Sequence, residues 1–287
     1  MNGAQRIRRA FETAAEEGRT AFIAYVLSGY PSEADGLAAA EAALAAGADL
    51  LEVGVPFSDP LADGPTIAAA GRMALAAGGG LPSAQRLVAS LRDRGHEAPI
   101  LVMSYLNPLL AAGEHETILA LRAAGTDGLV VPDLPAGASR RLERLAASIG
   151  LAISFLVTPN TSPERIERAV RASTGFVYVV PLLGVTGTRH ELAAGARELV
   201  ASVREASAGR APVAAGFGLG TADQVAELTP VADGLVIGSA LVAALRDGGP
   251  RRMGDLARSL ASAMTRSQRL APPAPRERGS AARDVRS

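Results

Sequence analysis

The sequence predicts one (β/α)8 barrel with an extra N-terminal helix and a C-terminal tail. Short apolar runs rich in β-branched residues recur along the chain, and stretches with helical spacing separate them. Several of the runs are almost continuously apolar, which is typical of parallel strands buried on both faces. Eight strand–helix units in about 260 residues fit a closed barrel better than an open doubly wound sheet, which is the alternative.

The elements follow one another in a regular order. Residues 1–18 are charged and amphipathic and predict a helix, not a secretion signal. Helical stretches such as 32–48 and 137–150 follow the strands. We expect a barrel domain over 1–268 and a disordered tail over 269–287, where Pro, Gly, Ser and Arg show no apolar period. The eight expected strands are residues 21–27, 49–54, 99–104, 128–132, 151–157, 175–180, 211–216 and 233–238.

Composition excludes several classes of function. The 287-residue chain is 48% hydrophobic and 20% charged, as in an ordinary globular protein, with a formal net charge of zero. This balance gives no electrostatic footprint for nucleic acid or an anionic membrane, and no apolar run has the length of a membrane span. The absence of cysteine excludes disulfides and thiolate chemistry, which fits a cytoplasmic protein.

The chain also contains no lysine, because all 29 of its Lys and Arg residues are arginine. A protein Schiff base needs a lysine amine. The sequence therefore excludes lysine-dependent aldol chemistry and covalently anchored pyridoxal phosphate.

Two carboxylates stand out in the stretch 51–66, "LEVGVPFSDPLADGPT". Glu52 lies near the end of the second predicted strand, and Asp63 follows eleven positions later in the next loop. Because the carboxyl ends of barrel strands surround the active-site mouth, both groups can face one pocket as an acid/base pair. The alternative is structural: Glu52 hydrogen-bonds a barrel neighbour, and Asp63 caps the helix that starts near Pro65. Spacing alone leaves both interpretations open.

Glycine-rich segments follow the last three predicted strands. They are "LLGVTGT" (182–188), "GFGLGT" (216–221) and "IGSA" (237–240). Barrels often bind phosphate in the loops after strands seven and eight, where backbone N–H groups and a helix N-terminus attract the anion. Ser239 adds a hydroxyl at the start of the last helix. The pattern predicts a phosphate site without lysine.

Other polar residues give weaker signals. The three histidines, His96, His115 and His190, do not have the spacing of a metal site. Asp133 follows the fourth strand, where it can either line the mouth or hold a turn. Tyr178 alternates with apolar neighbours, so it is either a core residue or a residue that reaches the pocket. We therefore expect no metal.

Several motifs together resemble one family. The stretch 51–66 is similar to a long and specific signature of the tryptophan synthase α-subunit family. "NPLL" (107–110), "PDLP" (132–135), "GVTGT", "GFGLGT" and "IGSALV" follow in the order and at about the separations of that family. The resemblance covers roughly residues 5 to 265.

The resemblance implies a retro-aldol cleavage of indole-3-glycerol phosphate to indole and glyceraldehyde 3-phosphate in tryptophan biosynthesis. It implies Glu52 as general acid/base, Asp63 as the residue that holds the indole N–H, and Tyr178 as a residue that positions both. No cofactor is expected in this chain, since pyridoxal phosphate would belong to a β-subunit in an α2β2 assembly. The remaining implied roles are an indole border of Tyr25, Ile67 and Met103, a loop residue Thr186 that orders Asp63, and phosphate contacts from Gly187, Gly218, Gly238 and Ser239.

Two departures from the family pattern bear on this expectation. Pro181 stands where the family commonly has Ser, and Tyr25 where Phe is frequent. Asp59 and Pro60, at the tip of the loop that faces the β-subunit in the family, are both present and favour a partner. The alternatives are a standalone lyase that releases free indole for secondary metabolism, a non-catalytic regulatory subunit, and another phosphate-binding barrel such as a sugar-phosphate isomerase.

Overall fold

The computed structural model describes residues 1–111, 113–180, 189–216 and 218–265. Nine parallel strands form one sheet with the order β5-β4-β3-β2-β1-β9-β8-β7-β6. Their residues are buried almost throughout, as expected for strands covered on both faces. The strands are β1 (Ala21–Leu27), β2 (Leu50–Gly54), β3 (Ile100–Met103), β4 (Gly128–Val130), β5 (Ala152–Ser154), β6 (Leu156–Val157), β7 (Val177–Val179), β8 (Val213–Gly216) and β9 (Gly234–Ile237).

The sheet closes on itself at Phe155. β5 pairs only with β4 and β6 only with β7, so the two ends of the strand order are consecutive pieces of chain. This confirms the predicted barrel and corrects one detail, because the predicted fifth strand 151–157 is divided in two. The backbone N–H of Phe155 is donated to the Ser173 hydroxyl, 3.1 Å away, and not to a neighbouring strand. Each of the other predicted strands agrees with the structure to within two residues at either end.

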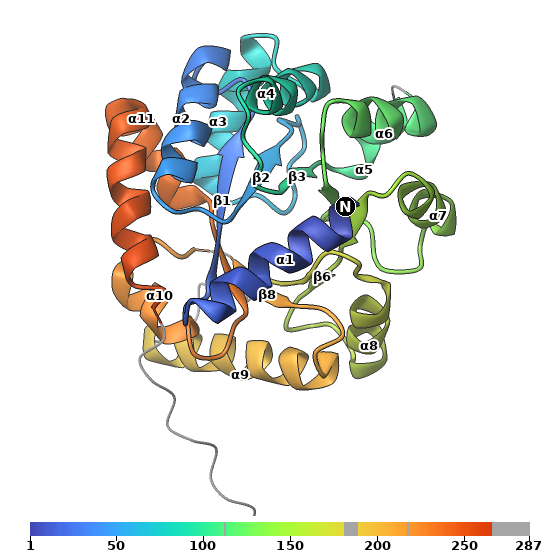
Figure 1. Cartoon of the computed structure of the whole chain (residues 1–287), viewed down its shortest axis with the longest axis vertical. Coiled ribbons are helices and arrows are strands. Elements are labelled where there is room, and N and C mark those ends of the chain that lie inside the picture. The colour runs from blue at the N-terminus through green and yellow to red at the C-terminus, as the bar shows by residue number, and fades with distance from the viewer. Residues whose placement is uncertain (112, 181–188, 217, 266–287) are drawn as a thin grey trace, which may run out of the picture.

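Helices surround the barrel in a ring, and α1 crosses one end of it (Figure 1). The long α11 is interrupted by non-helical backbone at Gly248 and Gly249. The helices are α1 (Gly3–Glu16), α2 (Glu33–Ala45), α3 (Pro65–Ala76), α4 (Leu81–Asp93), α5 (Leu106–Ala111), α6 (Glu114–Ala123), α7 (Arg140–Ser148), α8 (Pro163–Ala172), α9 (Arg189–Ser207), α10 (Ala222–Leu228) and α11 (Ser239–Ser262). Within the described ranges, no helix is both long enough and apolar enough to span a bilayer.

Helix α1 is the predicted extra N-terminal helix, and it closes the amino-terminal end of the barrel. Ile7, Phe11 and Ala14 of its apolar face pack into the cluster formed by the inward-facing strand residues. The Phe11 ring lies 5.7 Å from that of Phe176. Because α1 fills this end, the barrel interior can open at the carboxyl ends of the strands. The predicted domain boundary at 268 and the tail 269–287 lie outside the described residues.

A charged cluster fixes α1 to the barrel. The Asp127 side chain is only 3% exposed. It forms one ion pair with Arg6 of α1, at 2.9 Å, and another with Arg92 of α4, at 2.7 Å. The same carboxylate accepts the backbone N–H of Ile100 at 3.0 Å. Removal of Asp127 would leave two arginines without their shared counter-ion in a largely buried site.

We therefore expect Asp127→Ala to lower the free energy of unfolding by about 3–5 kcal/mol, the cost of breaking a buried ion pair. Urea denaturation followed by circular dichroism measures this. The matched control is Glu33→Ala, which breaks the exposed Glu33–Arg86 pair and should cost less than about 1 kcal/mol. Equal effects of the two substitutions would contradict a structural role for the cluster.

Candidate active site

A cavity of about 320 Å³ opens at the carboxyl ends of the strands. It is bordered by side chains and glycines from β1, β3, β7 and β9 and from the loops after β2, β8 and β9. Eight of the residues singled out from the sequence line it: Tyr25, Asp63, Ile67, Met103, Tyr178, Gly218, Gly238 and Ser239.

Glu52 is buried beside this cavity and does not form part of its lining. It lies on β2 and is 1% exposed, and neither of its carboxyl oxygens has a hydrogen-bond partner among the residues that the structure describes. Burial raises the pKa of Glu52 to about 8, and the negative charge of Asp63 adds to the rise. The alternative that Glu52 hydrogen-bonds a barrel neighbour is therefore wrong for the described residues. A carboxyl group in this state holds its proton near neutral pH and can donate it.

Asp63 lies in the loop that leads into α3 and faces the cavity. Helix α3 begins at Pro65, close to where the sequence predicts it, but its N-cap is Gly64 and no side chain caps it. Asp63 instead accepts a hydrogen bond of 3.0 Å from the hydroxyl of Tyr105. Partial burial raises the pKa of Asp63, and the Tyr105 hydrogen bond opposes that rise. The alternative of Asp63 as a helix cap is thus not what the structure contains.

Tyr105 is a site residue that the sequence analysis missed. Its hydroxyl donates to Asp63 and accepts the backbone N–H of Ala62 at 2.8 Å, so it fixes both ends of the short segment 62–63. Its ring lies 5.3 Å from that of Phe57 in the same loop. The available signal was its place two residues after β3, at the mouth of the barrel.

Tyr178 and Tyr25 border the cavity from β7 and β1, which β8 and β9 separate in the sheet. Tyr178 on β7 belongs to the inward-facing cluster and also lines the cavity. Burial, followed by the charge of Glu52, raises its pKa well above the ordinary value, so it stays protonated. Tyr25 on β1 pairs in register with Glu52 on β2. Both phenols therefore lie close to the buried carboxyl group.

Glycines and a helix N-terminus form another wall of the cavity. Gly218 follows β8 with a φ of +73°, a conformation that L side chains rarely adopt. Gly238 precedes α11, and Ser239 is the first residue of that helix. The arrangement offers backbone N–H groups and one hydroxyl to an anion. Thr186, Gly187 and Pro181 fall outside the described residues.

The other candidates do not join this cavity. Asp133 accepts the backbone N–H of Leu106 at 2.9 Å, so it holds a turn. His96 lies beside Glu41 at 3.3 Å, and His115 is largely exposed. In the part of the chain that the structure describes, no cluster of His, Cys, Asp and Glu is arranged to hold a metal ion.

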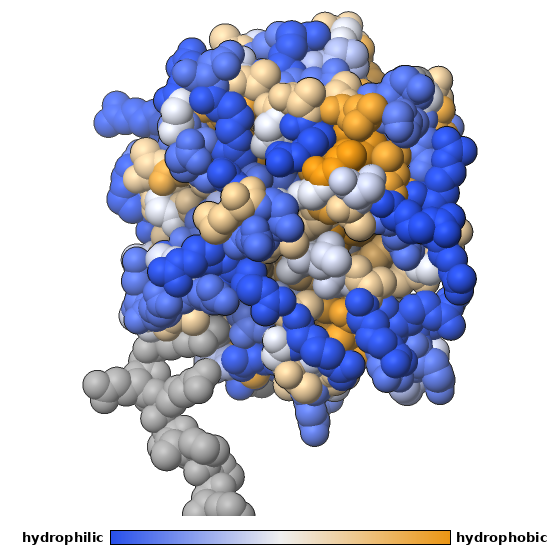
Figure 2. All heavy atoms as spheres, turned by 45° about the vertical axis from the view of Figure 1, so that its right-hand side comes forward, coloured by the Kyte–Doolittle hydropathy of each residue, from blue (hydrophilic) through white to orange (hydrophobic). Residues whose placement is uncertain are grey.

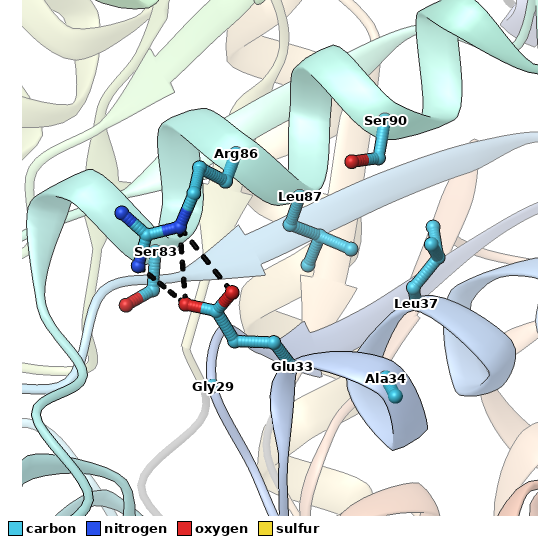
Figure 3. Close-up of a pocket in the computed structure, with 8 residues that line it drawn as sticks. All are labelled: Gly29, Glu33, Ala34, Leu37, Ser83, Arg86, Leu87 and Ser90. Atoms are coloured by element: carbon cyan, nitrogen blue, oxygen red, sulfur yellow. Dashed lines mark hydrogen bonds and ion pairs between the residues drawn. The ribbon is translucent and has the colours of Figure 1, made fainter.

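A second cavity, of about 180 Å³, lies on the outside of the barrel between α2 and α4 (Figure 3). Leu37 and Leu87 form its apolar side, and the Glu33–Arg86 ion pair crosses its edge with Arg86 Nε 3.1 Å from one carboxylate oxygen. It contains none of the candidate residues. Because a solvent-exposed ion pair of this kind is a surface feature, we assign the chemistry to the barrel mouth.

Comparisons with known proteins identify the family of the chain. The family model described as tryptophan synthase alpha chain matches residues 11–270. The tryptophan synthase alpha chain of Deinococcus radiodurans is 42% identical over 92% of this chain and 96% of its own length. The tryptophan synthase alpha chain of Geobacillus stearothermophilus is 46% identical over 80% of this chain and 84% of its own length. A structure of Mycobacterium tuberculosis tryptophan synthase superposes with a TM-score of 0.83 at 37% identity, covering 91% of this chain and 98% of the other. The chain belongs to the tryptophan synthase alpha chain family.

Proposed function

We propose that this chain cleaves indole-3-glycerol phosphate into indole and glyceraldehyde 3-phosphate. The observation that carries the proposal is the pair of carboxyl groups at one cavity. Glu52 is buried without a partner among the described residues and has a pKa of about 8, and Asp63 is partly exposed and held by Tyr105. Two carboxyl groups in such different environments are suited to different roles in proton transfer and charge stabilisation.

Glu52 supplies the proton transfers in this proposal. Its carboxyl group turns toward the cavity and protonates the indole carbon that carries the glycerol chain, which gives a positively charged ring. The resulting carboxylate then takes the proton of the neighbouring hydroxyl. As that O–H bond breaks, a C=O bond forms, the C–C bond cleaves, and its electron pair returns to the ring to restore indole.

Asp63 and the glycine-lined wall hold the substrate at its two ends. The Asp63 carboxylate accepts the indole N–H and stabilises the positive charge that ring protonation creates. Tyr25, Ile67 and Met103 border the ring, and Tyr178 positions the carboxyl groups. Gly218, Gly238 and Ser239 bind the phosphate at the α11 N-terminus. Thr186 and Gly187 keep the roles that the resemblance implies.

The partner in this proposal is a tryptophan synthase β-subunit, which would carry the pyridoxal phosphate and join indole to serine. Leu61, in the loop with Asp59 and Pro60, is 84% exposed, and Leu110 of α5 is 47% exposed. Such exposed apolar side chains beside a cavity mouth suit a protein partner. One side of the molecule also carries an apolar patch within a largely hydrophilic face, in the upper right of Figure 2.

The deciding experiment is steady-state cleavage of indole-3-glycerol phosphate by the purified chain, alone and with the β-subunit from the same source. Slow turnover that rises strongly with the β-subunit supports the proposal. Fast turnover that the β-subunit leaves unchanged would indicate a standalone lyase. Since the relatives are named as alpha chains of tryptophan synthase, neither that alternative nor a regulatory subunit is favoured.

Glu52→Gln should fold normally and lose at least about 100-fold in kcat, the scale of general acid–base catalysis. In the unsubstituted chain, kcat/KM should fall as the pH rises through about 8, because the acid form of Glu52 in the free chain is then lost. A stopped assay of indole release from pH 6 to 9 measures both the activity lost in the variant and the pH dependence of the unsubstituted chain. Near-full activity of the variant would rule out Glu52 as the acid.

Asp63→Asn should lower kcat by about 100-fold, because the amide cannot balance the positive charge on the ring. Tyr105→Phe keeps the ring contact with Phe57 and removes only the hydroxyl, so we expect a smaller loss of roughly 10-fold. Steady-state kinetics on the two variants compares them. A mild effect of Asp63→Asn would mean that Asp63 only shapes the loop.

Gly218→Val should raise KM for the substrate by about 10-fold or more, because a branched side chain opposes a φ of +73° and would crowd the phosphate in the proposed site. The matched control is Gly209→Val, which creates the same backbone strain at φ +76° in open space. Gly209 lies in the loop before β8, at the opposite end of that strand from Gly218. Calorimetric binding of glycerol 3-phosphate separates affinity from turnover. If both variants bind it as tightly as the original chain, phosphate is held elsewhere.

A further inference from the structure

Two groups at the candidate site have hydrogen-bonding capacity that the described structure does not use. Both carboxyl oxygens of Glu52 are buried without a partner. The hydroxyl of Tyr25 makes no hydrogen bond within the described residues, although its residue is only 4% exposed. The ionised Glu52 carboxylate can accept a hydrogen bond, and the Tyr25 hydroxyl can donate one. Tyr25 on β1 and Glu52 on β2 also pair in register.

The Tyr25 hydroxyl lies on the cavity side of Glu52. A Cβ atom added to Gly54 would come within 2.1 Å of the Tyr25 hydroxyl oxygen, so the phenol rests against Gly54. Gly54 follows Glu52 by two positions and therefore shares its face of β2. A Glu52 side chain that turns toward the cavity must pass beside this hydroxyl.

The electrostatic surroundings keep Tyr25 a donor. Burial, followed by the charges of Asp63 and Glu52 and the influence of Tyr105, raises its pKa well above the ordinary value. Tyr178 faces the same region from β7. Burial is the main cause of its raised pKa, and the charge of Glu52 is the next largest cause. Among the described lining residues of this cavity there is no arginine or histidine. The hydroxyl donors in this lining are the phenols of Tyr25 and Tyr178 and the side chains of Thr66 and Ser239. Of these four, Tyr25 is the one whose residue pairs in register with Glu52.

We propose that Tyr25 is a positioning residue whose hydroxyl donates a hydrogen bond to the Glu52 carboxylate after that carboxyl group has protonated the substrate. This inference rests on the proposed function. A buried carboxylate without donors is strongly disfavoured, yet the second proton transfer requires the carboxylate form. The Tyr25 hydrogen bond stabilises this form and aims it at the substrate hydroxyl, while the Tyr25 ring borders the indole.

The test is Tyr25→Phe, which removes one oxygen and keeps the ring. We expect kcat to fall by about 10-fold with KM within about twofold, because a hydrogen bond to a charged group is lost after binding. We also expect the pKa of Glu52 to rise, measured by NMR titration of carboxyl-labelled glutamate with Glu52→Gln identifying the signal. The control is Tyr30→Phe, since Tyr30 is equally buried but outside the cavity lining.

The possible outcomes separate this inference from the proposed function. Unchanged kcat and unchanged Glu52 pKa in Tyr25→Phe would overturn it, and a change in KM alone would reduce Tyr25 to a ring contact and also overturn it. The NMR titration measures the Glu52 pKa without requiring the chain to be catalytically active. If the original chain does not cleave indole-3-glycerol phosphate and the Glu52 pKa still rises in Tyr25→Phe, the proposed function fails while the hydrogen bond stands.

Discussion

The burial of the Glu52 carboxyl group on the inner face of β2 is the constraint on which the candidate site depends. Burial raises the pKa of Glu52 from 4.5 to about 8. Between these two pH values Glu52 keeps its proton in the folded chain and loses it in the unfolded chain. The unfolded state then binds fewer protons, so the free energy of unfolding falls as the pH rises from about 4.5 to 8. The barrel core and the α1 plug must offset this cost. The same burial gives Glu52 the proton that the proposed reaction requires.

The parallel register of the barrel explains why distant residues meet around that group. Pairing of Tyr25 with Glu52 and of Gly54 with Met103 places residues from β1, β2 and β3 at one end of the sheet. Helix α1 packs into the opposite end of the barrel. Glu52 lies at the boundary between the apolar interior and the cavity. Its position is therefore set by the barrel and not by a local motif.

The sequence predicted the elements well because their signals are local. A buried parallel strand reads as an apolar run, and the glycines after β8 and β9 mark the mouth. It could not decide between a catalytic and a capping role for Asp63, because that depends on Tyr105, which is 42 positions away. The sequence also did not indicate the division at Phe155, because the apolar run 151–157 is continuous. At that residue the backbone N–H donates to the Ser173 hydroxyl and not to a neighbouring strand. Non-local hydrogen bonds account for both failures.

The absence of lysine is compatible with the proposed cleavage for a chemical reason. Breaking the C–C bond of an aldol requires a group that accepts the electron pair, and a lysine iminium is one such group. An indole ring protonated at the carbon that carries the glycerol chain accepts that pair itself. The protein then has to supply a proton donor, a balancing negative charge and a grip on the phosphate. Glu52, Asp63 and the α11 N-terminus are groups of these three kinds, arranged around one cavity and its edge.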